Sequence, residues 1–85
     1  MKLRKPKTQV DELIHELLNT AHTTSLTMHL KYYISNVPDV VFRARNKGYA
    51  IETKIEERSN KFGRSISMAK WSLKDKEAAF KMYNK

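Results

Sequence analysis

A single glycine separates two kinds of periodicity in this chain. Before Gly48, three valines and an alanine recur at helical spacing over residues 36–47. After it, residues 49–57 alternate apolar and polar side chains, which is the period of a half-buried strand. Glycine readily adopts the left-handed conformation that ends a helix. The chain must therefore turn from a helix straight into a strand, and its 85 residues leave room for one small domain.

Several classes of protein are excluded by what the sequence lacks. Without cysteine there is no disulfide framework and no thiolate metal site. No run approaches the roughly 20 apolar residues that span a bilayer, and the start lacks the apolar core of a secretory signal. We expect a cytoplasmic protein with no membrane contact.

We also expect no enzyme, because the sequence has no glycine-rich phosphate loop, nucleophile elbow or carboxylate pair. His15, His22 and His29 recur at intervals of seven residues, but turn formers at 20–24 keep them off one helical face. We therefore expect no metal and no other cofactor.

The positive charge is large and unevenly distributed. The formal net charge is +8 and the pI is about 9.9. Residues 1–7 hold four basic and no acidic side chains, whereas residues 8–34 hold one basic and three acidic ones. Evenly spread charge would serve solubility, but segregated charge favours a polyanionic partner. Double-stranded DNA is the leading candidate.

The periodic segments predict three helices before the strand. Thr8 can cap a helix over 9–19, whose apolar stripe is Val10, Leu13, Ile14, Leu17 and Leu18. Thr24 or Ser25 can cap a second helix, with Leu26, Leu30, Tyr33 and Ile34 on one apolar face. Asn36 can cap the third helix, in which Pro38 is tolerated in the first turn.

The strand over 49–57 is followed by turn formers and by a second strand over 65–73, which predicts a hairpin. In the second strand the apolar residues change phase, so either a bulge shifts the register or both faces are partly covered. The expected core positions in the hairpin are Tyr49, Ile51, Ile55 and Trp71. Residues 74–85 favour a short terminal helix.

Roughly residues 8–73, and most strongly residues 41–73, resemble small winged helix-turn-helix DNA-binding proteins, which bacteriophages and mobile elements often encode. The matching positions are Arg45, Lys47, Gly48, Tyr49, Ile51, Glu52, Thr53, Asn60, Phe62, Gly63, Arg64, Ala69, Trp71 and Leu73. The resemblance implies an α+β fold of three helices and a two-stranded wing hairpin over 8–73. A basic mobile arm (1–7) would precede this domain and a short C-terminal helical tail (74–85) would follow it. The third helix would enter the major groove, and the wing (about 58–64) would contact the backbone or minor groove.

Arginine can form two hydrogen bonds with guanine, asparagine can form two with adenine, and lysine can pair with phosphate as a point charge. The expected DNA-binding residues are Asn36, Arg43, Arg45, Asn46 and Lys47 on the third helix, Arg58, Lys61 and Arg64 in the wing, and Lys2, Arg4 and Lys5, beside Lys7, in the arm. Arg45 flanks the buried stripe, so its stem can also cover the core. The Asp39 carboxylate either accepts a hydrogen bond from a cytosine amino group or, as we expect, caps the helix. Phe62 either wedges between bases or, as we expect, folds back to close its own loop.

We therefore expect a small transcriptional regulator, or an accessory factor in recombination or replication. The alternative is an interaction module that binds a host protein through Tyr32, Tyr33, Phe80, Met82 and Tyr83. The apolar tail leaves two alternatives open. It either joins copies into a homodimer or a cooperative assembly on DNA, or it packs back against the first helix of its own domain.

Overall fold

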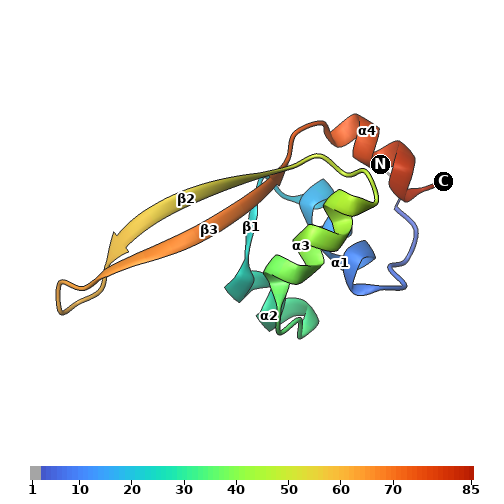
Figure 1. Cartoon of the computed structure of the whole chain (residues 1–85). Coiled ribbons are helices and arrows are strands. Elements are labelled where there is room, and N and C mark those ends of the chain that lie inside the picture. The colour runs from blue at the N-terminus through green and yellow to red at the C-terminus, as the bar shows by residue number, and fades with distance from the viewer. Residues whose placement is uncertain (1–2) are drawn as a thin grey trace.

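The computed structural model describes residues 3–85 and is an α+β arrangement of four helices and one three-stranded antiparallel sheet (Figure 1). The elements are, in chain order, α1 (Gln9–Asn19), β1 (Thr23–Thr24), α2 (Ser25–Tyr32), α3 (Val37–Asn46), β2 (Ile51–Ser59), β3 (Ser65–Leu73) and α4 (Lys76–Tyr83). Within residues 3–85, no helix is long and apolar enough to cross a membrane.

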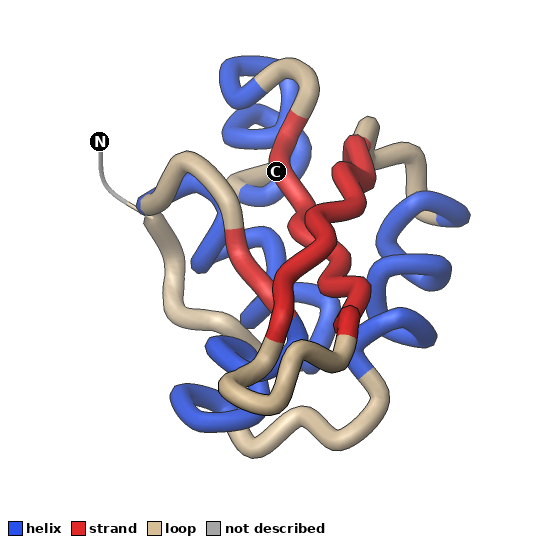
Figure 2. Tube along the Cα trace, turned by 90° about the vertical axis from the view of Figure 1, so that its left-hand side faces the viewer, coloured by secondary structure: helices blue, strands red, loops and turns tan. Residues whose placement is uncertain are grey.

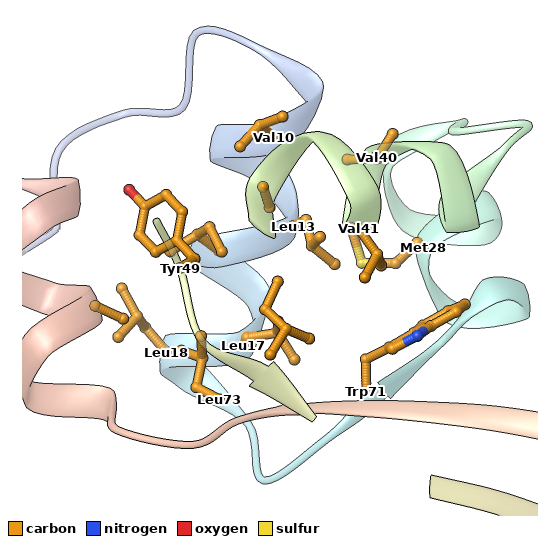
Figure 3. Packing of buried hydrophobic residues seen from close by; sticks show 14 of the residues in the cluster. Val10, Leu13, Leu17, Leu18, Met28, Val40, Val41, Tyr49, Trp71 and Leu73 are labelled. Carbon is orange, nitrogen blue, oxygen red and sulfur yellow. The ribbon is translucent and has the colours of Figure 1, made fainter. Parts of the chain in front are cut away.

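Helix α1 forms where its periodicity predicts it and supplies the centre of the core. The hydroxyl of Thr8 accepts a hydrogen bond from the Asp11 N–H at 3.1 Å, which caps the first turn. The predicted stripe is buried over its whole length, and Leu13, Ile14 and Leu17 are completely enclosed. Helices α3 and α4 and strand β3 pack against α1, so side chains from both ends of the chain meet there (Figure 3).

Helix α2 begins at the predicted cap but buries a different face. Thr24 accepts the Thr27 N–H at 3.2 Å. The buried side chain of the helix is Met28, and Ile34 is enclosed just beyond its end. Of the four residues expected to share one apolar face, three are largely exposed, Leu26 (60%), Leu30 (65%) and Tyr33 (83%). An eight-residue helix that packs mainly on α3 and β1 has room to bury one narrow stripe.

Helix α3 starts and stops as predicted. The Asn36 side chain accepts the Asp39 N–H at 3.3 Å at its start. At its end, the Gly48 N–H bonds to the Arg45 carbonyl at 3.0 Å, and the Tyr49 N–H bonds to the Ala44 carbonyl at 3.2 Å. These two bonds form a Schellman motif, with Gly48 at a φ of 109°. The motif satisfies carbonyls at the helix end and turns the chain toward β2.

The sheet has one strand more than the predicted hairpin. The strand order is β1-β3-β2, with Thr23 opposite Trp71 in the added pair. Strand β1 was missed because two threonines among turn formers have no alternation to detect. Strands β2 and β3 pair without a break from Ile51 opposite Leu73 to Ser59 opposite Ser65. The phase change in β3 therefore involves no bulge.

Only the base of the β2–β3 hairpin belongs to the core. The hairpin projects well beyond the helices (Figure 1), and viewed from its tip it has α3 on one side and β1 on the other (Figure 2). Ile51, Trp71 and Leu73 are buried at the base. Ile55 lies farther out and is 60% exposed, so its prediction as a core residue was wrong. Its alternation is that of a half-buried strand, but this part of β2 lies beyond the buried cluster.

The C-terminal segment packs on its own domain, which was one of the two alternatives for the tail. Ala79 and Tyr83 of α4 are buried against α1, and the Tyr83 ring meets His15 edge-on with centroids 6.1 Å apart. The Tyr83 hydroxyl donates to the Arg4 carbonyl at 2.8 Å. The Arg4 guanidinium lies 4.3 Å from the centre of the Tyr83 ring and donates two hydrogen bonds to Asp11, at 2.9 and 3.1 Å.

We predict that Gly48→Ala lowers the free energy of unfolding by about 1–3 kcal/mol, because an L side chain is strained at this φ. An added Cβ would also lie 3.3 Å from the Met82 methyl group, so the end of that side chain must move slightly. Urea denaturation monitored by circular dichroism measures the loss. Gly63→Ala is the matched control, since Gly63 also has a positive φ, of 81°, but an added Cβ there has no neighbour within 4 Å. A larger loss for Gly63→Ala would contradict the role given to Gly48.

We predict that the contact between the two ends of the chain weakens in acid. The hydrogen bond from Arg4 lowers the pKa of the Asp11 carboxyl, and burial opposes this shift. A carboxyl whose pKa is lower in the folded state stabilises the fold at any pH above its pKa in the unfolded chain, which is about 3.9 for aspartate. This stabilisation is lost as the pH falls through the folded-state pKa. Asp11→Asn should therefore lower Tm at pH 7 and flatten its decline between pH 5 and pH 2 (about the range in which aspartate protonates). An unchanged acid dependence in Asp11→Asn would contradict the prediction.

Candidate nucleic-acid interface

The outward face of α3 is defined by what the helix buries. Val37, Val40, Val41 and Ala44 face the core. On a helix of 3.6 residues per turn, the opposite side presents Asp39, Phe42, Arg43 and Asn46. This face combines one carboxylate, one apolar ring and two side chains that can donate hydrogen bonds. Helix α3 lies beside β2, so the face borders the base of the hairpin (Figure 2).

Arg43 is paired inside the helix. Its guanidinium forms an ion pair with the carboxylate of Asp39, one turn earlier, and both side chains are substantially exposed. The expectation that Asp39 caps the helix was wrong, because Asn36 provides the cap and the Asp39 carboxylate turns toward Arg43. An exposed pair of this kind contributes about 0–1 kcal/mol to stability, so an external anion can compete for the guanidinium.

Arg45 joins α3 to β2. Its guanidinium donates to the Ile51 carbonyl at 2.8 and 3.2 Å and to the Thr53 hydroxyl at 2.7 Å. These bonds satisfy backbone on the outer edge of β2, where no further strand pairs. The guanidinium is therefore a tether between helix and hairpin, and its planar fork of donors suits this better than a lysine would.

Three other predicted residues flank the same helix. Asn46 and Lys47 lie exposed at its end, and neither side chain forms a hydrogen bond or ion pair with any residue in the range 3–85. Asn36 is exposed at the opposite end, where its side chain is occupied as the cap. The unengaged donors on α3 thus gather toward its C-terminal end, next to β2.

The tip of the hairpin is a tightly bonded turn that carries two cations. The Asn60 side chain accepts the backbone N–H groups of Phe62 and Arg64, each at 2.9 Å, and Gly63 adopts a φ of 81°. Lys61 and Arg64 are exposed there. The expectation that Phe62 folds back over its own loop was wrong. The ring is 84% exposed, and the Lys61 ammonium lies 5.1 Å from its centre.

Farther from the tip, the charges of the hairpin are partly neutralised. Arg58 forms an ion pair with Glu56 at 3.4 Å, and Lys70 reaches the same carboxylate at 2.7 Å. The hydrogen bond from Lys70 lowers the pKa of the Glu56 carboxyl. Arg58 is therefore less available to an external anion than the two cations of the tip.

The predicted arm residues lie in different surroundings. Lys2 is outside the described residues, and Lys5 is exposed. Arg4 differs from the expected side chain on a mobile arm, because its guanidinium is held by Asp11 and by the Tyr83 carbonyl, the latter at 2.6 Å. Leu3 also packs against the core. The segment from residue 3 onward thus lies against the domain in this structure.

Three exposed apolar residues were not expected to be functional, Phe42 on α3 and Leu26 and Leu30 on α2. Phe42 is 62% exposed on the outward face of α3. Tyr33, which was expected only in the alternative of a host-protein contact, is exposed just beyond the end of α2, at a φ of 58°. Spacing alone cannot reveal such residues, since the same apolar letters on a short helix also suit a core. By contrast, Tyr32 is half-buried, its hydroxyl donates to Glu16 at 2.9 Å, and burial with this bond raises its pKa to about 12.

Comparisons with known proteins give no further assignment. The chain matched no protein-family model, no curated protein and no solved structure. In the described range 3–85, no group of three or more potential metal ligands comes together.

Proposed function

We propose that this protein binds double-stranded DNA as a winged helix-turn-helix domain, in which α3 reads the major groove and the β2–β3 hairpin is the wing. The observation that carries the proposal is the arrangement of two basic, exposed elements in one unit. The C-terminal half of α3 presents Arg43, Asn46 and Lys47, and Arg45 ties this helix to the base of a hairpin with Lys61 and Arg64 at its tip.

The dimensions of α3 and of the β2–β3 hairpin suit double-stranded DNA as a partner. An α-helix fits the major groove, which is about 12 Å wide. Nine residues per strand give the hairpin a length of about 30 Å, at roughly 3.3 Å per residue. That length lets the tip meet the backbone or the neighbouring minor groove while α3 occupies the major groove. A net charge of +8 supplies the attraction to phosphate.

We assign each side chain a role in DNA binding according to the hydrogen bonds and ion pairs that it already forms within the domain. Asn46 and Lys47 are unengaged donors for a base edge or a phosphate, and Arg43 joins them once it leaves Asp39. Lys61 and Arg64 contact phosphates at the wing tip. Within this proposal, the biological role is that of a small regulator of transcription, or an accessory factor in recombination or replication, of the kind that mobile elements encode.

A second candidate function is supported by the exposed side chains of Leu26 and Leu30 on α2, together with Tyr33 at its C-terminal cap. Exposed apolar side chains at helical spacing are typical of a surface that docks on a protein. The tail contributes less to such a surface than expected, because Tyr83 is buried and Phe80 is partly covered. Docking through α2 would tolerate salt, which separates it from DNA binding by charge.

We predict that changing Lys61 and Arg64 together to alanine weakens binding to all duplexes. The slope of log K against log salt concentration should become shallower by about one to two units, since each lost phosphate contact removes about 0.9. Gel-shift titrations of random and genomic duplexes at several salt concentrations measure the slope. The control is Lys81 and Lys85 changed to alanine, which removes the same charge at the other end of the molecule. An affinity that does not depend on salt concentration, or an equal change of slope in both double variants, would argue against the proposal.

We predict opposite effects for the two members of the α3 ion pair. Arg43→Ala should lower affinity for a preferred duplex by about 1–3 kcal/mol and relax the preference at one base pair. Asp39→Asn should strengthen binding to every duplex, because it removes a carboxylate from the DNA-facing side and releases Arg43. Fluorescence anisotropy on matched and mismatched duplexes checks both. Weaker binding by Asp39→Asn would instead show that the carboxylate itself contacts DNA, and a uniform loss in Arg43→Ala would assign that arginine to phosphate.

A further inference from the structure

Phe42 occupies an unusual position for a phenylalanine. It lies on the side of α3 opposite the four buried residues of that helix, and its side chain is 62% exposed. The ring is outside the core cluster and outside the group of partly buried residues that pack on it. Its exposure to water therefore serves no packing purpose within this domain.

One neighbour of Phe42 on the same face is an amide without a hydrogen-bond partner among the described residues. Asn46 follows it by four residues, which places the two side chains side by side, with about 5–6 Å between Cβ atoms. The Asn46 side chain forms no hydrogen bond with the residues that the structure describes, whereas Arg43 and Arg45 are both partnered. An apolar ring and an unpaired amide are thus adjacent on the C-terminal half of the face.

These two groups match one kind of base pair. In the major groove adenine offers an acceptor at N7 and a donor at N6, which an asparagine amide can bind together. Thymine adds a 5-methyl group, which favours contact with an apolar side chain. A guanine–cytosine pair has neither the methyl group nor the adenine pattern of donor and acceptor.

We propose that Phe42 and Asn46 form the part of the interface that determines specificity, with Phe42 against a thymine 5-methyl group and Asn46 on an adenine of the same or the next base pair. The inference rests on the proposed DNA-binding function and names the sequence class that α3 reads. Arg43, with its charge shared with Asp39, flanks this pair and adds affinity at the edge of the contact.

Removing the thymine methyl group tests the contact directly. A preferred duplex is selected from a random library with the full-length protein, and each thymine is then replaced in turn by deoxyuridine, which lacks only that methyl group. We expect the wild-type protein to bind one substituted duplex about fourfold more weakly, since burial of one such group is worth about 0.8 kcal/mol. Phe42→Ala should bind the thymine and uracil duplexes equally, and Phe42→Leu should retain part of the difference.

The control is Phe62→Ala, which removes the other strongly exposed phenylalanine and should leave the ratio between thymine and uracil unchanged. Replacing adenine by 7-deazaadenine at the paired or neighbouring position should weaken the wild type and not Asn46→Ala. Equal binding of wild type to every uracil-substituted duplex, or a library without enriched sequences, would overturn the inference and leave general DNA binding intact. Absence of any DNA binding would remove the proposed function itself.

Discussion

The apolar stripe of α1 is the feature on which the rest of the fold depends. Leu13, Ile14 and Leu17 are completely enclosed, and α3, α4 and β3 cover them from different sides (Figure 3). In a domain of this size, each enclosed leucine or isoleucine represents about 1.5–3 kcal/mol of burial, a large part of a marginal stability. The terminal helix joins this core, so the ends of the chain meet at Arg4 and Tyr83 instead of remaining free.

The hairpin depends on the helices only at its base, and this leaves its outer half free for another purpose. Trp71 and Leu73 anchor it in the core, while Arg45 fixes α3 to its outer edge. Beyond Ile55 the two strands are held by their own ladder and by the bonded turn at Asn60. The outer half of the hairpin contributes no side chain to the core, and its tip carries exposed cations. For this reason we propose an external anion as its partner.

The outward face of α3 shows how charge and shape interact in this proposal. Arg43 forms an ion pair with Asp39, and Arg45 is hydrogen-bonded to β2. Two of the cations that we expected to bind DNA therefore already have partners inside the domain. The side chains left over are the amide of Asn46, the ammonium of Lys47 and the ring of Phe42. The proposal therefore assigns specificity to the match of this amide and ring with base edges, and affinity to the cations at the hairpin tip.

The sequence by itself determined the local elements. Spacing placed α1 and β3 at their observed bounds, and the caps at Thr8, Asn36 and Gly48 follow from local backbone chemistry that neighbouring residues supply. Which faces are covered was decided only by the tertiary structure. Leu26 and Ile55 carry the periodicity of buried residues, yet both lie outside the core and are largely exposed, and the pairing of Thr23 with Trp71 joins positions that are adjacent only after folding. Burial and ion pairing depend on neighbours that are distant in the chain, and periodicity reports only which residues share a side.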